Sequence, residues 1–205
     1  MTNRPVNFSD PTGHDGEPTW LDKLNPFSFD TWFISARGAL KFYIGVEGDL
    51  TLYVDTKPIK EQGIRGLANI KVSLNVEGAI SGGASVKLRG AVVAGSTKDD
   101  IDDRPGANLI VKDGYSGTAA GCTPNGICVG IAPEFDKNFK IKTKGVLFGF
   151  GEGFDVSANI LEVSDYFFKG DAKNRKVEWQ VPVANRNFLE KLPLVGPAIK
   201  KYFPE

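Results

Sequence analysis

Histidine, on which many enzymes depend for acid–base work or metal binding, occurs once in this sequence, at His14. HNH nucleases, zinc deaminases, histidine-ligated metalloproteases and hydrolases with a Ser–His or Cys–His pair all need imidazole. His14 lies in a turn-rich N-terminal segment, well before the apolar body of the chain. We therefore expect none of these chemistries, and any catalytic site should work without histidine.

One histidine-free site can be assembled from the remaining polar residues. An ADP-ribosyltransferase of the arginine, serine, glutamate type needs an arginine on an early strand, a Ser/Thr pair and a late glutamate. Arg37, Ser116-Gly117-Thr118 and Glu178 supply these residue types in this order, although their local contexts do not resemble that family.

A second histidine-free site would be a ribonuclease built on a basic strand. Its candidate residues, which could face phosphate, are Lys140, Lys142, Thr143 and Lys144. The simpler interpretation of the same segment is the polar face of an amphipathic strand. The glycine-rich run 149–153 is a strand and not a strand-to-helix phosphate loop, so we expect no nucleotide cofactor there.

The two cysteines, Cys122 and Cys128, flank the turn signal Pro124-Asn125-Gly126. Such a turn brings the two thiols together across a tight loop. The sequence leaves two alternatives, a disulfide suited to an oxidising destination or two unbonded thiols. Two cysteines and one distant histidine cannot fill four coordination positions, so no metal site is expected.

Composition and charge narrow the class of protein further. Lysine plus arginine equals aspartate plus glutamate at 25 each, and a nucleic-acid binder usually has a basic excess. Nucleic acid is therefore not expected as a partner. The acidic segment 98–105 does not match the calcium-loop spacing, and a solvated loop is favoured over a Ca²⁺ site. The start of the chain lacks an apolar signal-peptide core, so we expect another protein to carry it out of the cell.

Apolar and polar residues alternate with period two in three long segments. Successive side chains of a strand point to opposite faces, so this pattern predicts amphipathic β-strands and excludes helices. In the first segment the even positions are apolar or glycine: Trp32, Ile34, Ala36, Gly38, Leu40, Phe42, Ile44, Val46, Gly48, Leu50, Leu52 and Val54. The second segment repeats this at Ile70, Val72, Leu74, Val76, Ile80, Ala84, Val86, Leu88 and Val92, and the third at Val146, Phe148, Phe150, Phe154, Val156, Ala158 and Ile160.

A single strand of such length would reach roughly 75–90 Å, so each segment is expected to fold into a hairpin of about ten-residue strands. Each segment contains an acidic residue followed by glycine: Glu47-Gly48, Glu77-Gly78 and Glu152-Gly153. These pairs are interpreted either as a weak repeat or as three hairpin tips. One more strand is expected at Lys176–Val183, followed by a tail with near-helical spacing that Pro193 and Pro197 interrupt.

The alternation itself suggests a function. Glycine-rich amphipathic hairpins of this length are what β-barrel pores insert into membranes. The even face would then meet lipid, while charged residues of the other face line water: Lys41, Glu47, Lys71, Glu77, Lys87 and Arg89. A water-soluble sandwich or barrel alternates for the same physical reason, so the pattern leaves both open.

The N-terminal segment does not have the pattern of an independent fold. Its residues are Arg4-Pro5-Val6-Asn7-Phe8-Ser9-Asp10-Pro11-Thr12-Gly13-His14. They resemble the motif N-P-V-N-x-x-D-P-x-G-L that closes the repeat shell of Rhs and YD-repeat proteins. Arg4 stands where that family usually has asparagine, and His14 where it often has leucine. The match covers about 5% of the chain.

The resemblance implies how the protein would be released and delivered. In that family a shell of repeats encloses a variable C-terminal toxin and cuts the chain just after this motif. Asp10, Pro11, Gly13 and His14 would form the self-cleavage junction, and the toxin would begin near Asp15. The implied partners are the parent shell, a cognate immunity protein and a target-cell membrane, with secretion and delivery to a target cell.

The sequence thus predicts a mainly β protein whose antiparallel sheet, sandwich or barrel-like, is built of long amphipathic hairpins, with a short C-terminal helical segment. Its expected divisions are a shell remnant (1–14), a linker whose aromatics dock on the body (15–31), a β domain (32–185) and a helical tail (186–205). The expected function is an antibacterial or anti-host toxin that permeabilises membranes. The alternatives are a histidine-free enzymatic toxin and a non-catalytic binding module. No cofactor is expected.

Overall fold

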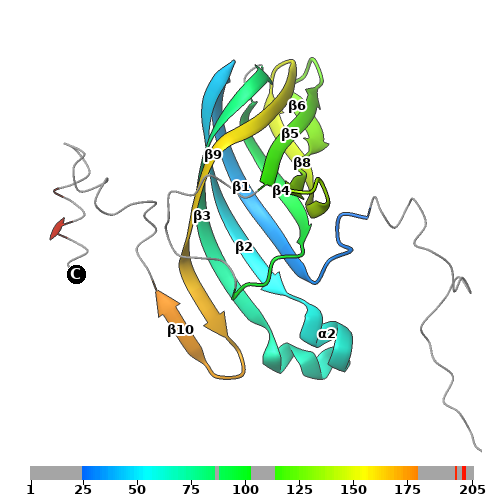
Figure 1. The fold of residues 1–205 in the computed structure, drawn as a ribbon, viewed down its shortest axis with the longest axis vertical. Coiled ribbons are helices and arrows are strands. Elements are labelled where there is room, and N and C mark those ends of the chain that lie inside the picture. The colour runs from blue at the N-terminus through cyan, green and yellow to red at the C-terminus, as the bar shows by residue number, and fades with distance from the viewer. Residues whose placement is uncertain (1–24, 86–87, 103–113, 180–196, 198–199, 202–205) are drawn as a thin grey trace, which may run out of the picture.

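The computed structural model describes residues 25–85, 88–102, 114–179, 197 and 200–201. The strands are β1 (Thr31–Phe42), β2 (Ile44–Asp55), β3 (Lys71–Ser85), β4 (Leu88–Thr97), β5 (Gly114–Cys122), β6 (Ile127–Ile131), β7 (Glu134–Asp136), β8 (Ile141–Gly151), β9 (Phe154–Asp171) and β10 (Lys176–Trp179). A helical segment, α2 (Lys57–Gln62) followed by the 3-10 helix η1 (Gly63–Asn69), separates β2 from β3 (Figure 1). The predicted mainly β, antiparallel class is confirmed.

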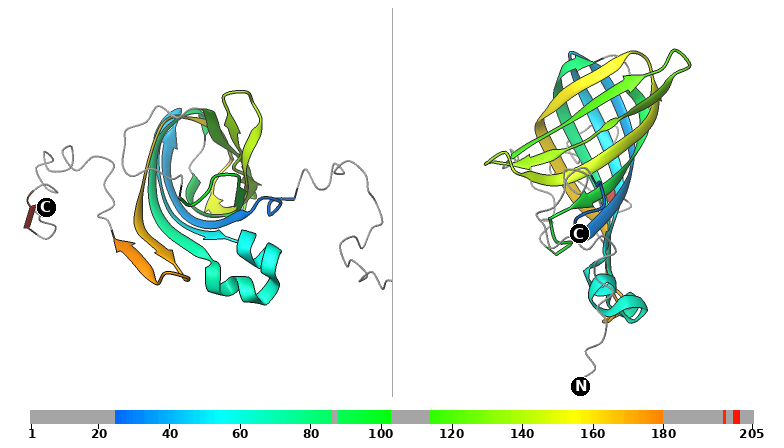
Figure 2. Two further views of the ribbon diagram at one scale, coloured as in Figure 1. Left: turned by 60° about the horizontal axis from the view of Figure 1, so that its bottom comes forward. Right: turned by 90° about the vertical axis from the view of Figure 1, so that its right-hand side faces the viewer.

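The sheet closes on itself as an eight-stranded antiparallel barrel. Strand β9 makes the closure, because it pairs with β3 along one edge and with β5 along the other. The short strands β6 and β7 share one position between β5 and β8 (Figure 2). Of the two predicted architectures, sandwich-like or barrel-like, the structure is therefore the barrel. An eight-stranded barrel has an interior just wide enough to be filled by side chains.

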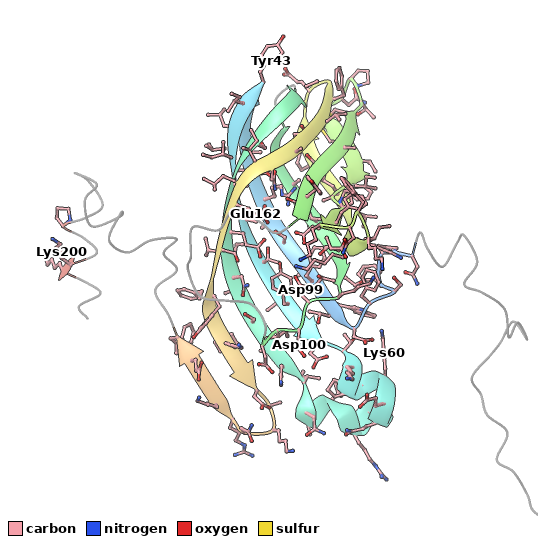
Figure 3. All side chains as sticks on the ribbon, viewed as in Figure 1. Tyr43, Lys60, Asp99, Asp100, Glu162 and Lys200 are labelled. Carbon is pink, nitrogen blue, oxygen red and sulfur yellow. A yellow bond between two sulfur atoms is a disulfide. The ribbon has the colours of Figure 1, made fainter. Side chains whose placement is uncertain are left out.

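The two ends of the barrel are built differently. The β1–β2, β5–β6 and β8–β9 connections are tight turns at one end, called here the hairpin end, which Tyr43 marks in Figure 3. The opposite end, called the helical end, carries α2, η1 and the chain that follows β4, with Lys60, Asp99 and Asp100 labelled in the same view. Each long segment is divided into two strands as predicted, but only the first is a hairpin. Among the described strands, β3 pairs with β2 and β9 and not with β4, and β8 pairs with β4, β6 and β7 and not with β9, because closure of the barrel places other strands between them.

The interpretation of the acidic–glycine pairs as three hairpin tips is wrong, because two of the pairs lie inside strands and the third joins two strands that do not pair with each other. Gly48 and Gly78 lie in mid-strand and are paired directly across β2 and β3. Only Glu152-Gly153 forms a turn, between β8 and β9, where Gly153 has a φ of 76° that favours glycine. At Glu47-Gly48 and Glu77-Gly78 the alternation of inward and outward side chains continues through the glycine. A strand tolerates glycine where no turn residues follow it.

The helical segment at 57–69 was not predicted. Its sequence nevertheless carries a start signal, since Thr56 is the N-cap and a proline follows in the first turn. Gly66 allows η1 to pack on α2, because a Cβ atom at this position would lie 2.0 Å from the Pro58 carbonyl oxygen. The segment closes the connection between β2 and β3 at the helical end.

The described end of the segment predicted as a linker contacts the barrel. The rings of Phe27 and Trp32 lie 5.3 Å apart, and the backbone N–H of Phe29 donates to Ser96 Oγ at 3.0 Å. The predicted last strand is present as β10, whose continuation to Val183 lies outside the described residues. The shell remnant 1–14, most of the linker and all but three residues of the predicted helical tail also lie outside them.

Candidate functional site: an apolar outer wall and a polar lumen

The outer wall of the barrel is mostly apolar over the described strands. Where their side chains are described, the even-numbered residues of β1 to β4 point outward, as do the corresponding positions of β5, β6, β8 and the first half of β9. Large side chains among them are exposed: Leu50 is 47% exposed, Phe150 71% and Leu40 78%. The fuller set of exposed apolar side chains on the wall is Trp32, Ile34, Ile44, Val46, Leu52, Val76, Ile80, Val92, Ile127, Val129, Ile131, Phe148, Phe154, Val156 and Ile160.

Aromatic side chains flank this wall at both ends. Tyr43, Phe150 and Phe154 lie at or beside turns of the hairpin end and are exposed. The helical end has exposed Trp32 and Trp179, together with the stacked pair Tyr115 and Phe139, whose ring centroids are 4.7 Å apart. Two aromatic groups thus bracket the aliphatic part of the wall.

The interior of the barrel, called here the lumen, is polar for most of its height. Its buried residues include Ser35, Glu47, Thr51, Ser73, Asn75, Ser81, Ser116, Thr118, Thr143, Asp155 and Ser157. The apolar part is small and lies against β4, β6 and β8, with Val93 and Leu147 at its centre. This distribution is the inverse of a water-soluble barrel, whose apolar side chains fill the interior.

An ion pair between β1 and β2 occupies the middle of the lumen. Arg37 and Asp49 face each other across the two strands. The Arg37 Nε donates to Asp49 Oδ1 at 2.8 Å and its Nη2 donates to Oδ2 at 2.9 Å. Both side chains are mostly buried, at 13% and 9% exposed. The two-pronged geometry fixes the guanidinium and makes the contact specific for arginine.

The surroundings shift the protonation of this pair. Burial alone would lower the pKa of the Arg37 guanidinium, but the charges of Asp49, Glu47 and Glu77 raise it above its ordinary value. Burial raises the pKa of the Asp49 carboxyl, and attraction to Arg37 offsets this only in part. Arg37 therefore stays charged at any working pH and is the cation around which the neighbouring carboxylates gather.

Hydroxyl groups and carboxylates are hydrogen-bonded to one another along the lumen. Near the helical end, Thr143 donates to Glu134 Oε2 at 2.7 Å. At mid-height, Ser116 donates to Glu162 Oε2 at 2.8 Å. Toward the hairpin end, Thr118 donates to Asp155 Oδ2 at 2.8 Å. On the β2–β3 side, the Tyr53 hydroxyl donates to Glu77 Oε1 at 2.7 Å.

Two small cavities of about 30 Å³ each lie on either side of the ion pair. Arg37, Asp49, Glu77 and Glu134 line both of them. The first cavity extends to Ser116, Asn159 and Glu162, and the second extends to Tyr53 and Thr143. Each is large enough for a water molecule or two, and each is polar.

The residues predicted for an ADP-ribosyltransferase are not brought together. Arg37 and Ser116 line the same lumen cavity, and Thr118 lies further along the lumen. Glu178 is on β10, in a different pocket that it shares with Lys71 and Lys169. The glutamate that Ser116 contacts is Glu162.

The residues proposed for a ribonuclease lie on both faces of β8, because successive side chains of a strand point to opposite sides. Thr143 points into the lumen, while Lys142 forms an ion pair with Asp99 and Lys144 donates to Ser28 Oγ at 2.9 Å. Lys140 is exposed at the helical end. Lys142 and Lys144 thus share the outer face of β8, where Asp99 and Ser28 engage them, and Thr143 lies on the opposite face.

The acidic segment after β4 is engaged by lysines. Asp102 is bonded to Lys71 and lies 3.6 Å from Lys169, and the hydrogen bond from Lys71 lowers the pKa of the Asp102 carboxyl. Within residues 98–102 and the rest of the described chain, no group of three acidic, histidine or cysteine residues is placed to hold a metal ion.

The two cysteines form a disulfide in the structure. Cys122 and Cys128 are directly paired across β5 and β6, next to the turn at the hairpin end. Cys128 is fully buried, so the bond lies on the inner side of the barrel wall.

Replacing both cysteines by serine is expected to lower the free energy of unfolding by about 2 kcal/mol, because the closed loop loses its constraint in the unfolded chain. Urea unfolding of the two proteins, each with and without reductant, measures the difference. Reductant should lower the stability of the wild type only. Equal stability of the two oxidised proteins would contradict the constraint.

Sequence reasoning missed most of the lumen residues, above all Asp49, Glu134 and Glu162. The signal for Asp49 was present, since it is an odd-numbered acidic residue on the face opposite the apolar one. Glu134 and Glu162 gave no such signal, because β7 is only three residues long and the pairing of β3 with β9 shifts register at Ile160. Glu47 and Glu77 were predicted to line water, and the structure turns both into the lumen.

The fold and site together define an eight-stranded antiparallel barrel with a polar, filled lumen and an apolar outer wall. No protein-family model, curated protein or solved structure matches this chain. Within the described residues, no helix is long and apolar enough to cross a membrane.

Proposed function

We propose that this chain is a toxin of the Rhs type that acts on a membrane, into which it inserts as an eight-stranded barrel with its outer wall in contact with lipid. The proposal combines the resemblance of residues 4–14 to the Rhs closing motif with the distribution of side chains on the barrel. The parent shell would carry the toxin out of the producing cell, and a cognate immunity protein would protect that cell.

The single observation that carries the membrane part is the inversion of the barrel. Exposing so many large apolar side chains to water is costly, at roughly 25 cal/mol for each Å² of apolar surface. In a bilayer the same wall costs nothing, and the polar backbone groups are already satisfied where the strands pair around the closed part of the sheet, where β9 meets both β3 and β5. The polar residues that would be misplaced in a water-soluble core are then sheltered from lipid.

The dimensions of the wall agree with a bilayer. Strand β2 has 12 residues, which at about 3.3 Å per residue gives roughly 40 Å of length. Tilted by roughly 40°, as strands of membrane barrels are, it would span about 30 Å of hydrocarbon. The aromatic groups at the two ends would lie at the two interfaces, where tyrosine and tryptophan are favoured.

The ends of the barrel suggest a direction of insertion. In the described turns of the hairpin end, at residues 43, 123–126 and 152–153, the only charged side chain is Glu152, and the sequence adds Lys41, Lys87 and Arg89 in or beside the connections of this end. The helical end carries many charges, among them Lys57, Lys60, Lys173 and Arg175. Because each charge resists transfer through hydrocarbon, the hairpin end should cross the bilayer and the helical end should stay on the side of entry.

The test is incorporation of the purified full chain into liposomes. We expect the protein to float with the vesicles after an alkaline carbonate wash, and trypsin added outside to cut in the helical segment 57–69 while the barrel strands stay protected. Cells should be harmed more when the protein is exported to the periplasm than when it stays in the cytoplasm. Protein that remains in the soluble fraction at every lipid composition would contradict the proposal.

A further inference from the structure

The barrel is too narrow to act as an open pore, so the way in which it would harm a membrane must be sought in the lumen. The Arg37–Asp49 pair stands between two cavities of about 30 Å³ each, room for water molecules but not for a hydrated metal ion. A proton needs no such room, because it moves by exchange along hydrogen-bonded groups.

We infer that the lumen is a proton path, which dissipates a proton gradient across the membrane that holds the barrel. This inference rests on the proposed function, since it requires the barrel to span a bilayer. Protons enter at one end and leave at the other, so the step has no other reactant and no net change in the protein.

The groups of the path can be followed from the helical end. Thr97 Oγ1 lies 2.9 Å from Thr143 Oγ1, and Thr143 is bonded to Glu134. Thr143 and Glu134 both line the cavity on their side of the ion pair, together with Glu77. The path therefore reaches the middle of the barrel through hydroxyls, a carboxylate and a water-sized space.

The first cavity, which extends to Ser116, Asn159 and Glu162, continues from the same carboxylates. Glu77, Glu134, Glu162 and Ser116 all line it. The side-chain oxygen of Asn159 lines the cavity as well, is buried, and has no hydrogen-bond partner within the described part of the chain. It offers a place for a water molecule to donate a hydrogen bond.

The last stretch leads to the hairpin end. Ser157 is the next inward residue of β9 beyond Asn159, and its Oγ lies 2.8 Å from Thr118 Oγ1. Thr118 is bonded in turn to Asp155, which is 1% exposed and lies directly beside the β8–β9 turn. Hydroxyl and carboxylate groups thus follow one another through the height of the barrel.

The charge along the path favours a cationic species. The described side chains that face the lumen include one arginine and six carboxylates: Arg37, Glu47, Asp49, Glu77, Glu134, Asp155 and Glu162. Asp49 balances the charge of Arg37 where both line the two cavities, so the arginine does not present a bare positive charge to a passing proton. Anions would meet carboxylates on both sides of the pair.

The test uses the full chain in liposomes that contain a pH-sensitive dye, with a potassium diffusion potential set by valinomycin to drive protons inward. We expect proton uptake at least tenfold faster than in empty liposomes. Potassium efflux without valinomycin, and release of a trapped larger dye, should stay at the level of empty liposomes.

The variant that tests the path is Glu134→Gln combined with Glu162→Gln. Glutamine keeps the size of the side chain and still accepts the hydrogen bonds from Thr143 and Ser116, but it cannot carry a proton. We expect the proton flux to fall at least tenfold with unchanged incorporation. The matched control is Glu61→Gln, which removes an exposed carboxylate of α2 outside the lumen and should leave the flux unchanged.

The outcomes separate the two proposals. Failure of the wild type to float with liposomes overturns the proposed function and the proton path with it. Incorporated protein without proton uptake, potassium efflux as fast as proton uptake, or undiminished flux in the double variant overturns the proton path alone. Faster proton uptake that the double variant loses and Glu61→Gln keeps supports it.

Discussion

Replacing Leu50 by arginine is expected to reduce incorporation of the protein into liposomes by about 30-fold or more. Leu50 points outward near the middle of β2 and is 47% exposed. An arginine on the lipid face near the bilayer midplane costs about 2–4 kcal/mol, and each 1.4 kcal/mol is a factor of ten in an equilibrium. The measurement is the fraction of protein that floats with vesicles over a series of lipid concentrations.

The matched control is Ala172→Arg. Ala172 is exposed in the turn between β9 and β10 at the helical end, so the substitution adds the same charge outside the apolar wall. We expect incorporation within about twofold of the wild type. If both variants float as well as the wild type, the outer wall does not meet lipid. A loss of similar size in both would point to net charge and not to the position on the wall.

Replacing Arg37 by leucine is expected to lower the free energy of unfolding by about 3–5 kcal/mol, the usual cost of removing one partner from a buried ion pair. Arg37 is the cation that attracts Asp49, Glu47 and Glu77. Its loss leaves these carboxylates close together, whereas loss of Asp49 leaves Arg37 near the other two. Asp49→Leu should therefore cost less than Arg37→Leu. Denaturant unfolding of the folded protein in detergent micelles measures both.

Two further variants make this result specific. Arg65→Leu removes an exposed arginine of η1 and should change the stability by less than about 0.5 kcal/mol. In the double variant Arg37→Leu/Asp49→Leu the cost should be smaller than the sum of the two single costs, because the residues are in contact. An Arg37→Leu variant as stable as Arg65→Leu would show that the pair does not hold the lumen together.

The sequence by itself determined the strands and their two faces. Strict alternation from Trp32 to Val54 and from Ile70 to Val92 can be satisfied only by amphipathic β-structure, since side chains of a strand point to opposite sides. It also determined that the turn between Cys122 and Cys128 could bring the thiols together, and that histidine chemistry is not expected. These conclusions need only local geometry and residue type.

Only the tertiary structure decided which face is inside. Alternation is the same for a wall that faces lipid and for one that faces a core, because shifting the whole pattern by one residue changes no local preference. Closure by β9 against β3 and β5 fixed the apolar face outward and carried Glu134 and Glu162 to the same cavity as Arg37. These residues are far apart in the chain, so no spacing in the sequence could have joined them.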